Sequence, residues 1–387
     1  MMSSARTFDV IIAGAGSVGT PTAMYLAQAG FSVLVIEALP SCGQASNKHA
    51  IGGVRATHSD PSKIYLCADS INILSTWQEK YGDDIEWRSG GYSFVAYDEN
   101  VEANLKSLLA VQKSFGLNID WRSADQILQL IPGLQPKGLR GGTFSPEDGS
   151  ASPLKTAAAF YKHAKASGAE FHFNEKVSQV ALANGRVNQI ITDREQYNCK
   201  YFINAAGSWA GEISALLGVP LPVQPEAHEA AITEPTQPMF DAMVVDIRPT
   251  PGSNNFYFYQ HPTGKIIFCL TPDPPIMGFL NQNTSGFLTA GSQRLIDLMP
   301  KLMNLRLRRS WRGTYPMTPD GLPILGNVDS VGGYLLATGL CGQGFMLGPG
   351  VARLLTHLIE GNLNPQEQAC LESLSLQRAF TSEEMLK

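Results

Sequence analysis

The chain has 387 residues, of which 44% are hydrophobic and 16% are charged, and its formal net charge at pH 7 is -5. That length exceeds what one ordinary hydrophobic core serves, so we expect a globular protein of two domains. The acidic balance excludes a basic surface for nucleic acid or anionic lipid, and no run of about eighteen apolar residues predicts a membrane span. We therefore expect a cytoplasmic protein that binds small molecules.

The six cysteines are scattered along the chain and form no C-x-x-C pair or other metal-ligand spacing. This usage is typical of a reducing compartment, and we expect no metal site. The first residues contain one basic side chain, Arg6, ahead of an apolar run that glycines interrupt. We therefore expect no signal peptide.

The start of the chain has the pattern of a βαβ unit. An apolar run of strand length, residues 8–13, leads into Gly14, Gly16 and Gly19, and a helix-length segment and a second apolar run ending at Glu37 follow. Gly14 allows the tight turn, Gly16 lets the backbone approach a pyrophosphate, and Gly19 lets the helix pack closely on the sheet. The phosphates would meet the helix N-terminus, and Glu37 would accept hydrogen bonds from the ribose. The unit predicts a dinucleotide site for FAD or NAD rather than NADP.

Residues 38–58 are rich in small and polar side chains and follow neither helical nor strand periodicity. Gly52-Gly53 marks a close backbone approach, and the segment begins directly after the ribose-binding strand. This place suits a segment that runs along the bound dinucleotide, and an ordinary surface loop is the alternative.

The rest of the chain alternates between two patterns, which indicates that the second domain is inserted into the first. Residues 220–312 as a whole are strand-rich, and the tail after about Leu374 lacks anchoring features. We predict helices over 61–81, 100–116, 153–168 and from the glycine-dense segment 342–350 to about 358, and strands over 90–97, 170–173, 176–183, 189–192, 200–204, 256–259, 264–268 and 333–339.

Two strand ends carry small residues that permit backbone contact with a ligand. One strand ends in Ala205-Ala206-Gly207, and another leads into the glycines of 342–350 at the start of a helix. A strand-to-helix turn that contacts no ligand would show the same small residues, so this alternative stays open. In the strand 256–259, Tyr257 and Tyr259 share one face, for which sheet packing is favoured over a binding wall.

Together these motifs resemble one family, the FAD-dependent amine oxidoreductases that include glycine oxidase, sarcosine oxidase and D-amino acid oxidase. The resemblance covers nearly the whole chain and is closest to the sarcosine oxidase β-like branch. The motifs that carry it, in chain order, are Val10–Gly19, Ala45-Ser46 with Gly52–Arg55, Asn204–Ala210, Thr318–Gly326 and Gly339–Gly350.

The resemblance implies an α/β fold, α+β overall, in which an antiparallel-sheet substrate domain is inserted into a Rossmann-like FAD-binding domain, as in D-amino acid oxidase. The FAD-binding domain would comprise residues 1–80, 145–220 and 321–387, and the substrate-binding domain residues 81–144 and 221–320. The implied reaction is the oxidation of a secondary amine or amino acid of the sarcosine, glycine or proline kind. A hydride passes from the carbon beside nitrogen to flavin N5, and water hydrolyses the resulting imine.

Carried over residue by residue, the resemblance also implies the site. Residues expected to bind FAD are Gly14, Gly16, Ser17, Val18, Gly19, Glu37, Ala38, Ser46, His49, Gly52, Gly53, Val177, Ala206, Gly207, Trp209, Gly342, Gln343, Gly344, Phe345 and Met346. Residues expected to act on the substrate are Arg55, Tyr259, Tyr315, Gln343 and Met346. Arg55 would face a substrate carboxylate or the reduced flavin, unless it is an ordinary salt-bridged arginine.

His49 raises the question of a covalent flavin. The segment Ser46–Gly52 reproduces the pattern in which the dimethylglycine dehydrogenase branch attaches its flavin to a histidine. We expect His49 beside a noncovalent flavin, with covalent attachment as the alternative. Gly313 stands where monomeric sarcosine oxidase has its covalent cysteine, which argues against that second linkage.

Two positions depart from the family in the substrate site. Tyr315 stands where glycine oxidase-like enzymes have a carboxylate-binding arginine, and Met346 where sarcosine oxidases have a lysine. Loss of a cation removes the charge-assisted contact on which carboxylate recognition depends. We therefore expect a larger or more apolar substrate, or one held elsewhere, for example by Arg55, Tyr259 or Arg312.

Two other functions stay open on the sequence alone. One is the FAD-dependent oxidation of a 2-hydroxy acid or polyol, and the other is a partner-dependent flavoprotein subunit with little activity alone. Oxygen or another electron acceptor would reoxidise the flavin, and both homo-oligomers and hetero-oligomers fit the resemblance.

Overall fold

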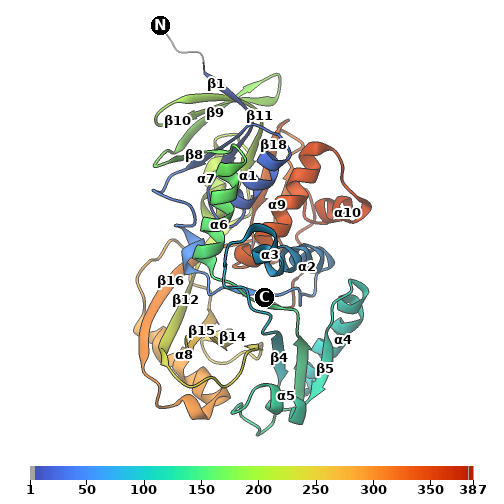
Figure 1. The fold of residues 1–387 in the computed structure, drawn as a ribbon, viewed down its shortest axis with the longest axis vertical. Helices are drawn as coiled ribbons and strands as arrows, with labels where there is room; N and C mark the ends of the chain where they lie inside the picture. Colours follow the sequence, from blue (N-terminus) through green and yellow to red (C-terminus); the bar gives the residue numbers. More distant parts are fainter. Residues whose placement is uncertain (1–4, 382, 387) are drawn as a thin grey trace.

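The computed structural model describes residues 5–381 and 383–386. Two eight-stranded sheets occupy opposite ends of the molecule, and the two-stranded pair β3–β7 belongs to neither (Figure 1). Among the described residues, no helix combines the length and the apolar character needed to cross a bilayer.

The first sheet has the strand order β17-β18-β11-β1-β2-β8. Neighbours along this order are parallel except for β17 and β18, and β9 and β10 extend it as an antiparallel ribbon from β11. Its strands are β1 (Arg6–Ala13), β2 (Val33–Glu37), β8 (Glu170–Phe173), β9 (Val177–Ala183), β10 (Arg186–Thr192), β11 (Gln196–Asn204), β17 (Ile324–Asn327) and β18 (Tyr334–Thr338).

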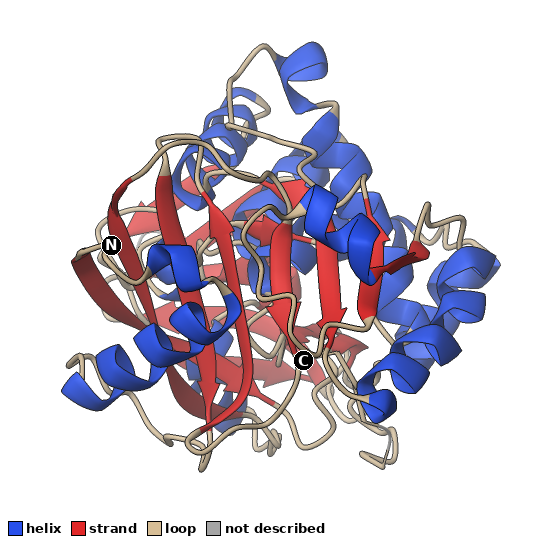
Figure 2. Ribbon diagram, turned by 90° about the horizontal axis from the view of Figure 1, so that it is seen from below, coloured by secondary structure: helices blue, strands red, loops and turns tan. Residues whose placement is uncertain are grey.

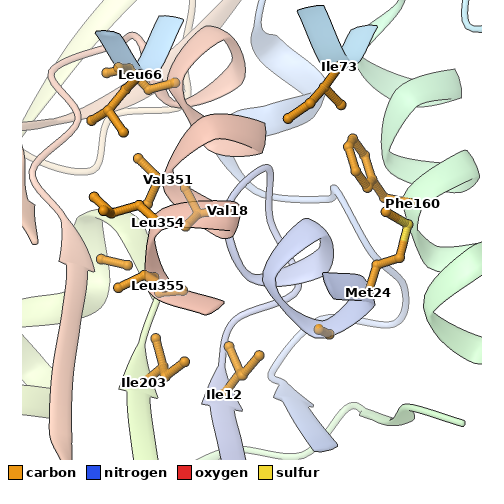
Figure 3. Packing of buried hydrophobic residues seen from close by; sticks show 14 of the residues in the cluster. Ile12, Val18, Met24, Leu66, Ile73, Phe160, Ile203, Val351, Leu354 and Leu355 are labelled. Carbon is orange, nitrogen blue, oxygen red and sulfur yellow. The ribbon is translucent and has the colours of Figure 1, made fainter. Parts of the chain in front are cut away.

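Both faces of the first sheet are buried, as the nearly continuous apolar run of β1 requires. On one face, Ile12 and Ile203 lie near Leu354 and Leu355 of a covering helix, and the same core extends to Phe160 (Figure 3). Each such buried side chain stabilises the fold by about 1.5–3 kcal/mol. The helices on this face are α1 (Gly19–Gln28), α2 (Pro61–Ser75), α6 (Pro153–Ala166) and α9 (Gly344–Glu360).

The second sheet has the order β16-β12-β15-β14-β13-β4-β6-β5. Figure 2 views the molecule from the end at which this sheet lies. On one face, Phe256, Phe258 and Phe268 form a core with Phe287 of α8 (Ser285–Leu298), and residues of the other face line a cavity shared with the first sheet. Its strands are β4 (Tyr92–Ala96), β5 (Asp120–Ser123), β6 (Gly141–Ser145), β12 (Gln224–Pro235), β13 (Met243–Asp246), β14 (Ser253–Gln260), β15 (Lys265–Pro272) and β16 (Leu307–Met317).

The remaining elements connect the sheets and cover their edges. They are η1 (Ser46–His49), β3 (Gly53–Val54), α3 (Trp77–Tyr81), α4 (Glu99–Ser114), α5 (Ala124–Leu130), β7 (Gly149–Ser150), η2 (Gly207–Trp209), α7 (Ala210–Ala215), α8 (Ser285–Leu298), η3 (Pro300–Leu302) and α10 (Pro365–Ser373).

The structure confirms the predicted fold class, and four details differ from the predictions. The second sheet contains one parallel pair, β4 with β13, which the long connection between these two strands permits. The predicted helix 61–81 is interrupted at Thr76. The strand-rich stretch 220–312 contains the helix α8, which buries Phe287, Leu295 and Leu298 at helical spacing.

The fourth difference is the tail, which is anchored where the sequence predicted a loose end. Glu384 and Leu386 are both 1% exposed. Glu384 accepts hydrogen bonds from Ser59 N at 2.9 Å and Ser59 Oγ at 2.7 Å, and it lies 3.3 Å from Lys63 Nζ. One buried carboxylate thus ties the end of the chain to the start of α2.

The strands of the first sheet come from residues 6–37, 170–204 and 324–338, and those of the second from 92–145 and 224–317. This division follows the expected domain ranges except at β6, whose last residue, Ser145, lies just beyond the expected boundary at 144. We keep these ranges as proposed domain limits; residues 1–4, 382 and 387 lie outside the described part of the chain.

Candidate active site

A cavity of about 450 Å³ extends from the carboxyl ends of β1 and β2 to the second sheet. It lies within the size range of ligand pockets, at the sheet edge where open α/β folds bind their ligands. Its wall combines backbone from the first sheet and side chains from the second.

The glycines after β1 differ in what surrounds them. Gly14 has φ +105°, and a Cβ there would lie 2.6 Å from Ala205 O. A Cβ on Gly19 would lie 1.9 Å from Gly14 O, so only glycine lets α1 begin so close to the turn. Gly16 has no described atom within 4 Å of its Cβ position and lines the cavity. Gly16 therefore leaves space for a ligand at the N-terminus of α1, whereas Gly19 serves packing and lies outside the lining.

Glu37 fixes this end of the cavity. Its carboxylate accepts hydrogen bonds from Ala15 N at 2.7 Å and Leu39 N at 2.9 Å. Burial raises the pKa of the carboxyl group, and these two hydrogen bonds lower it again in part. The side chain lines the cavity beside Ala38 and Val177.

The segment around η1 runs along the cavity and is bound to the second sheet. Ser46 Oγ donates to Thr314 O at 2.7 Å, and His49 O accepts from Trp311 Nε1 at 2.8 Å. Gly313 has no side chain where His49 packs, since a Cβ there would lie 2.8 Å from His49 Cβ. Burial lowers the pKa of His49, and the charges of Lys48 and Arg309 lower it further.

The glycines before α9 bring the last helix to the same cavity. Gly342 has φ +78°, and a Cβ there would lie 2.2 Å from Tyr315 Cε2. A Cβ on Gly348 would lie 2.0 Å from Ser17 O, so α9 packs directly on the turn that precedes α1. Gln343 Oε1 is buried and has no hydrogen-bond partner among the described residues. Two helix N-termini and an unpaired amide oxygen therefore meet one space.

The second sheet forms a roof over the other end of the cavity. The register pairs Glu226 with Tyr315, His228 with Gly313, and Ala230 with Cys269, and Cys269 in turn pairs with Tyr257. Because paired residues of neighbouring strands share a face, this roof face consists of residues from four strands. His228, Tyr257, Cys269 and Tyr315 all line the cavity.

A chain of contacts joins the polar groups of the roof. Glu226 Oε1 lies 2.9 Å from His228 Nε2, and the His228 ring stacks on the Tyr315 ring with centroids 3.8 Å apart. The hydroxyl of Tyr315 lies 3.0 Å from that of Tyr257. Burial raises the pKa of both phenols, so both are neutral at physiological pH.

With this geometry established, comparison with known proteins identifies the family. The family model described as FAD dependent oxidoreductase (DAO) matches residues 9–358. The chain belongs to this flavoprotein family. The flavoprotein is 24% identical to hydrogen cyanide synthase subunit HcnC of Pseudomonas aeruginosa over 406 aligned residues, which cover 94% of this chain and 95% of HcnC.

Two further comparisons match the flavoprotein to a sarcosine dehydrogenase and to the crystal structure of a proline dehydrogenase. Mitochondrial sarcosine dehydrogenase of Mus musculus is 24% identical over 373 residues, which cover 91% of this chain and 40% of that protein. The crystal structure of L-proline dehydrogenase from P. horikoshii matches with a TM-score of 0.90 and 26% identity, covering 97% of this chain and 98% of that chain. These matches confirm the predicted family and the predicted cofactor, FAD.

The residues of the flavoprotein fit FAD on observations of this cavity. Gly16 leaves open space at the N-terminus of α1, where a pyrophosphate binds, and Glu37 stands at the end of β2, where a ribose binds. Gln343 Oε1 offers an unpaired acceptor at the far end. Every residue predicted to bind FAD lines the cavity except Gly19.

Residues predicted to act on the substrate fall into two groups. Tyr315, Gln343 and Met346 line the cavity. Tyr259 lies outside its lining: its hydroxyl donates to Ile51 O at 2.6 Å, and the side chain lines a separate cavity of about 410 Å³. Arg312, named as an alternative anchor, lies on the far face of the sheet, where it donates to Glu229 Oε2 at 2.6 Å.

Arg55 lines the cavity, but its guanidinium group is engaged elsewhere. It donates to Thr57 O and Leu386 O, and Nη1 lies 3.0 Å from His58 Nδ1. The end of the chain therefore holds the cation that the sequence assigned to a carboxylate or the flavin.

The sequence analysis did not identify His228, which lines the cavity, or Glu226, whose carboxylate contacts His228. The alternation of buried residues along β12 was the available signal, but alternation does not say which face of a strand meets a cavity.

Proposed function

We propose that this flavoprotein oxidises a secondary amine or amino acid at a carbon beside the nitrogen. The observation that carries the proposal is the single cavity in which a fitted FAD site continues into a roof of neutral, hydrogen-bonding side chains. Bound FAD would supply the two-electron acceptor, taking a hydride from that carbon, and the resulting imine would be hydrolysed by water.

The chain's own residues would bind and orient the amine. Tyr257 and Tyr315 present hydroxyl groups that both donate and accept hydrogen bonds. Phe345 and Met346 form an apolar part of the same wall and exclude water from it. The names of sarcosine dehydrogenase and L-proline dehydrogenase support amine chemistry on this fold.

The proposal predicts a pH dependence. An ammonium group has no lone pair to support loss of hydride from the neighbouring carbon, so the neutral amine is the reacting form. Turnover should rise with pH through the ionisation of the amine, and anaerobic stopped-flow reduction across that range measures it. A rate that does not change with pH would contradict the mechanism.

The absorption spectrum tests the cofactor first. The purified protein should be yellow, and acid precipitation should release FAD into the supernatant, since we propose a noncovalent flavin beside His49. A yellow pellet would show covalent attachment instead. Anaerobic bleaching with amines and with 2-hydroxy acids then separates the proposed reaction from oxidation of an alcohol.

A partner-dependent subunit is the second candidate, and one surface favours it. Trp209, which is 38% exposed, stacks at 4.8 Å on Phe279, which is 41% exposed, and Met277 and Leu280 are exposed in the same loop as Phe279. HcnC is named as a subunit. If the isolated chain binds FAD, no amine reduces it, and added partner subunits restore reduction, this candidate replaces the first. The electron acceptor, the oligomeric state and the cytoplasmic location stay predictions.

A further inference from the structure

We infer that the substrate is an amine with no carboxylate on either carbon attached to its nitrogen. This inference rests on the proposed function and narrows its substrate class. Two observations support it: which side chains face the cavity, and which partners the nearby basic side chains already contact.

The roof face contains no cation within the cavity. At the cavity-facing positions of β12, β14, β15 and β16, all of which are described, the basic side chains are Lys265 and Arg309. Neither lines the cavity, and the exposed Arg309 lies with its guanidinium carbon 5.2 Å from the centre of the Trp311 ring. Tyr315 occupies the position where glycine oxidase-like enzymes have a carboxylate-binding arginine, and its side chain is neutral.

The cations that do line the cavity are engaged or remote. Arg55 directs its two terminal nitrogens to Thr57 O and Leu386 O, so both nitrogens are already engaged by backbone oxygens. Lys176 lies beside Glu175 at the Glu37 end and forms an ion pair with Glu212 at 3.7 Å. A carboxylate under the roof would therefore find no free cation among the described residues.

What the roof does offer suits an amine. Glu226 Oε1 lies 2.9 Å from His228 Nε2, and in the neutral imidazole tautomer that donates from Nε2 to this oxygen, Nδ1 presents a lone pair. His228 is 5% exposed, lines the cavity, and its Nδ1 has no partner among the described residues. An N–H of the substrate would satisfy this acceptor, and the negative charge of Glu226 would favour a positive nitrogen and disfavour a carboxylate.

The aromatic rings strengthen the same preference. Tyr315 is held between His228 on one side and Gly342 on the other, and its hydroxyl contacts that of Tyr257. Tyr257 also lines the cavity, and the face of an aromatic ring attracts an alkylammonium group through its negative quadrupole. The roof therefore combines an aromatic wall, a free acceptor and a buried negative charge.

The holoenzyme gives a direct test with matched pairs of amines. Pyrrolidine with proline, and dimethylamine with sarcosine, differ within each pair by one carboxylate. We expect the amines without a carboxylate to half-bleach the flavin anaerobically at concentrations at least tenfold lower than their partners. Equal or stronger reduction by proline or sarcosine would overturn the inference and leave the proposed function intact. Failure of all four amines would overturn the proposed function, and the inference with it.

Binding without turnover provides a second readout. Tetramethylammonium and acetate are not oxidised, and both are small enough for the cavity, so each is titrated while the visible flavin band is followed. We expect tetramethylammonium to perturb the band at concentrations at least tenfold lower than acetate. A response to acetate alone, or to neither ion, would count against the inference.

Variants of the roof complete the test. Glu226→Gln keeps the hydrogen bond to His228 and removes the charge, so tetramethylammonium should bind several-fold more weakly while the flavin spectrum stays unchanged. Tyr315→Arg should give acetate and proline a binding cation and reverse the preference. Tyr315→Phe is the conservative control, which should weaken amine binding without improving acetate binding. If Glu226→Gln retains FAD and binds both ions like the wild type, the assigned role of Glu226 is wrong.

Discussion

The two ends of the cavity are built in different ways. The FAD end consists mainly of backbone, namely the turn at Gly14 and Gly16 and the N-termini of α1 and α9. Glu37 adds one side-chain carboxylate. The roof consists of side chains, which the register of β12, β14, β15 and β16 brings onto one face.

This difference determines how each end responds to substitution. A backbone site fails when a Cβ enters it, because neighbouring main-chain atoms have no freedom to move away. A side-chain site changes its ligand when one residue changes, while the fold persists. The predictions below test this contrast.

Gly19→Ala should have the largest effect. The new Cβ would lie 1.9 Å from Gly14 O, a main-chain atom, so α1 must move from the sheet. We expect the free energy of unfolding, measured with urea on the apoprotein, to fall by about 4 kcal/mol or more.

Gly16→Ala is the matched control, because no described atom lies within 4 Å of its Cβ position. It should change the stability of the apoprotein by no more than about 0.5 kcal/mol and weaken FAD binding at least tenfold, or about 1.4 kcal/mol. If the two variants were equally stable, the conclusion that Gly19 is needed for helix packing and Gly16 for ligand space would be wrong.

Glu384→Gln should lower the free energy of unfolding, because the tail of the chain stabilises the start of α2 through this carboxylate. Its loss leaves Lys63 buried without a counter-charge, which costs about 3 kcal/mol. Burial pushes the pKa of Glu384 upward, yet Lys63 and His58 hold it below its ordinary value of 4.5.

A carboxylate with a lowered pKa stabilises the native state above that ordinary value and loses the contribution as pH falls. The stability gap between wild type and Glu384→Gln should therefore be widest at neutral pH and narrow below about pH 4.5. Glu372→Gln, an exposed carboxylate on α10, is the control and should change stability by less than about 0.5 kcal/mol. A gap independent of pH would contradict the assignment.

Gly342→Ala should affect both ends. The left-handed backbone disfavours alanine, and the new Cβ would meet Tyr315 Cε2 at 2.2 Å. Because the ring can shift, we expect weaker amine binding by about tenfold, or about 1.4 kcal/mol, and a smaller loss of FAD affinity. Gly211→Ala, where no described atom lies within 4 Å, should leave both unchanged. If the variant lost FAD and still bound amines normally, Gly342 would act mainly on the FAD end and not on the roof.

The contact between Trp209 and Phe279 should have the smallest effect. It joins a residue of the cavity wall to a loop of the second sheet, and it is worth about 0.5–1.5 kcal/mol. Trp209→Ala and Phe279→Ala should each speed FAD release about threefold, and the double variant should be no faster than the worse single one. Additive effects would show that the two rings act independently.

The sequence was enough to predict the glycine turn after β1 and the acidic residue at the end of β2. Gly14, Gly16, Gly19 and Glu37 lie within 24 residues of one another and act through their own backbone or a neighbour's, so their spacing carries the geometry. The family, the cofactor and the alternation of the two sheets followed from that motif and from later motifs of the same kind.

The arrangement of the roof could not be predicted from the sequence. Tyr257 and Tyr259 share a strand face, yet Tyr257 lines the cavity, whereas Tyr259 donates to Ile51 O and lines a separate cavity. Arg312 points to the far face because β12 and β16 pair in one register, and Arg55 is held by Leu386, which is 331 residues away along the chain. Such contacts depend on pairing between distant segments, and a local pattern of residues does not encode which face or which partner they meet.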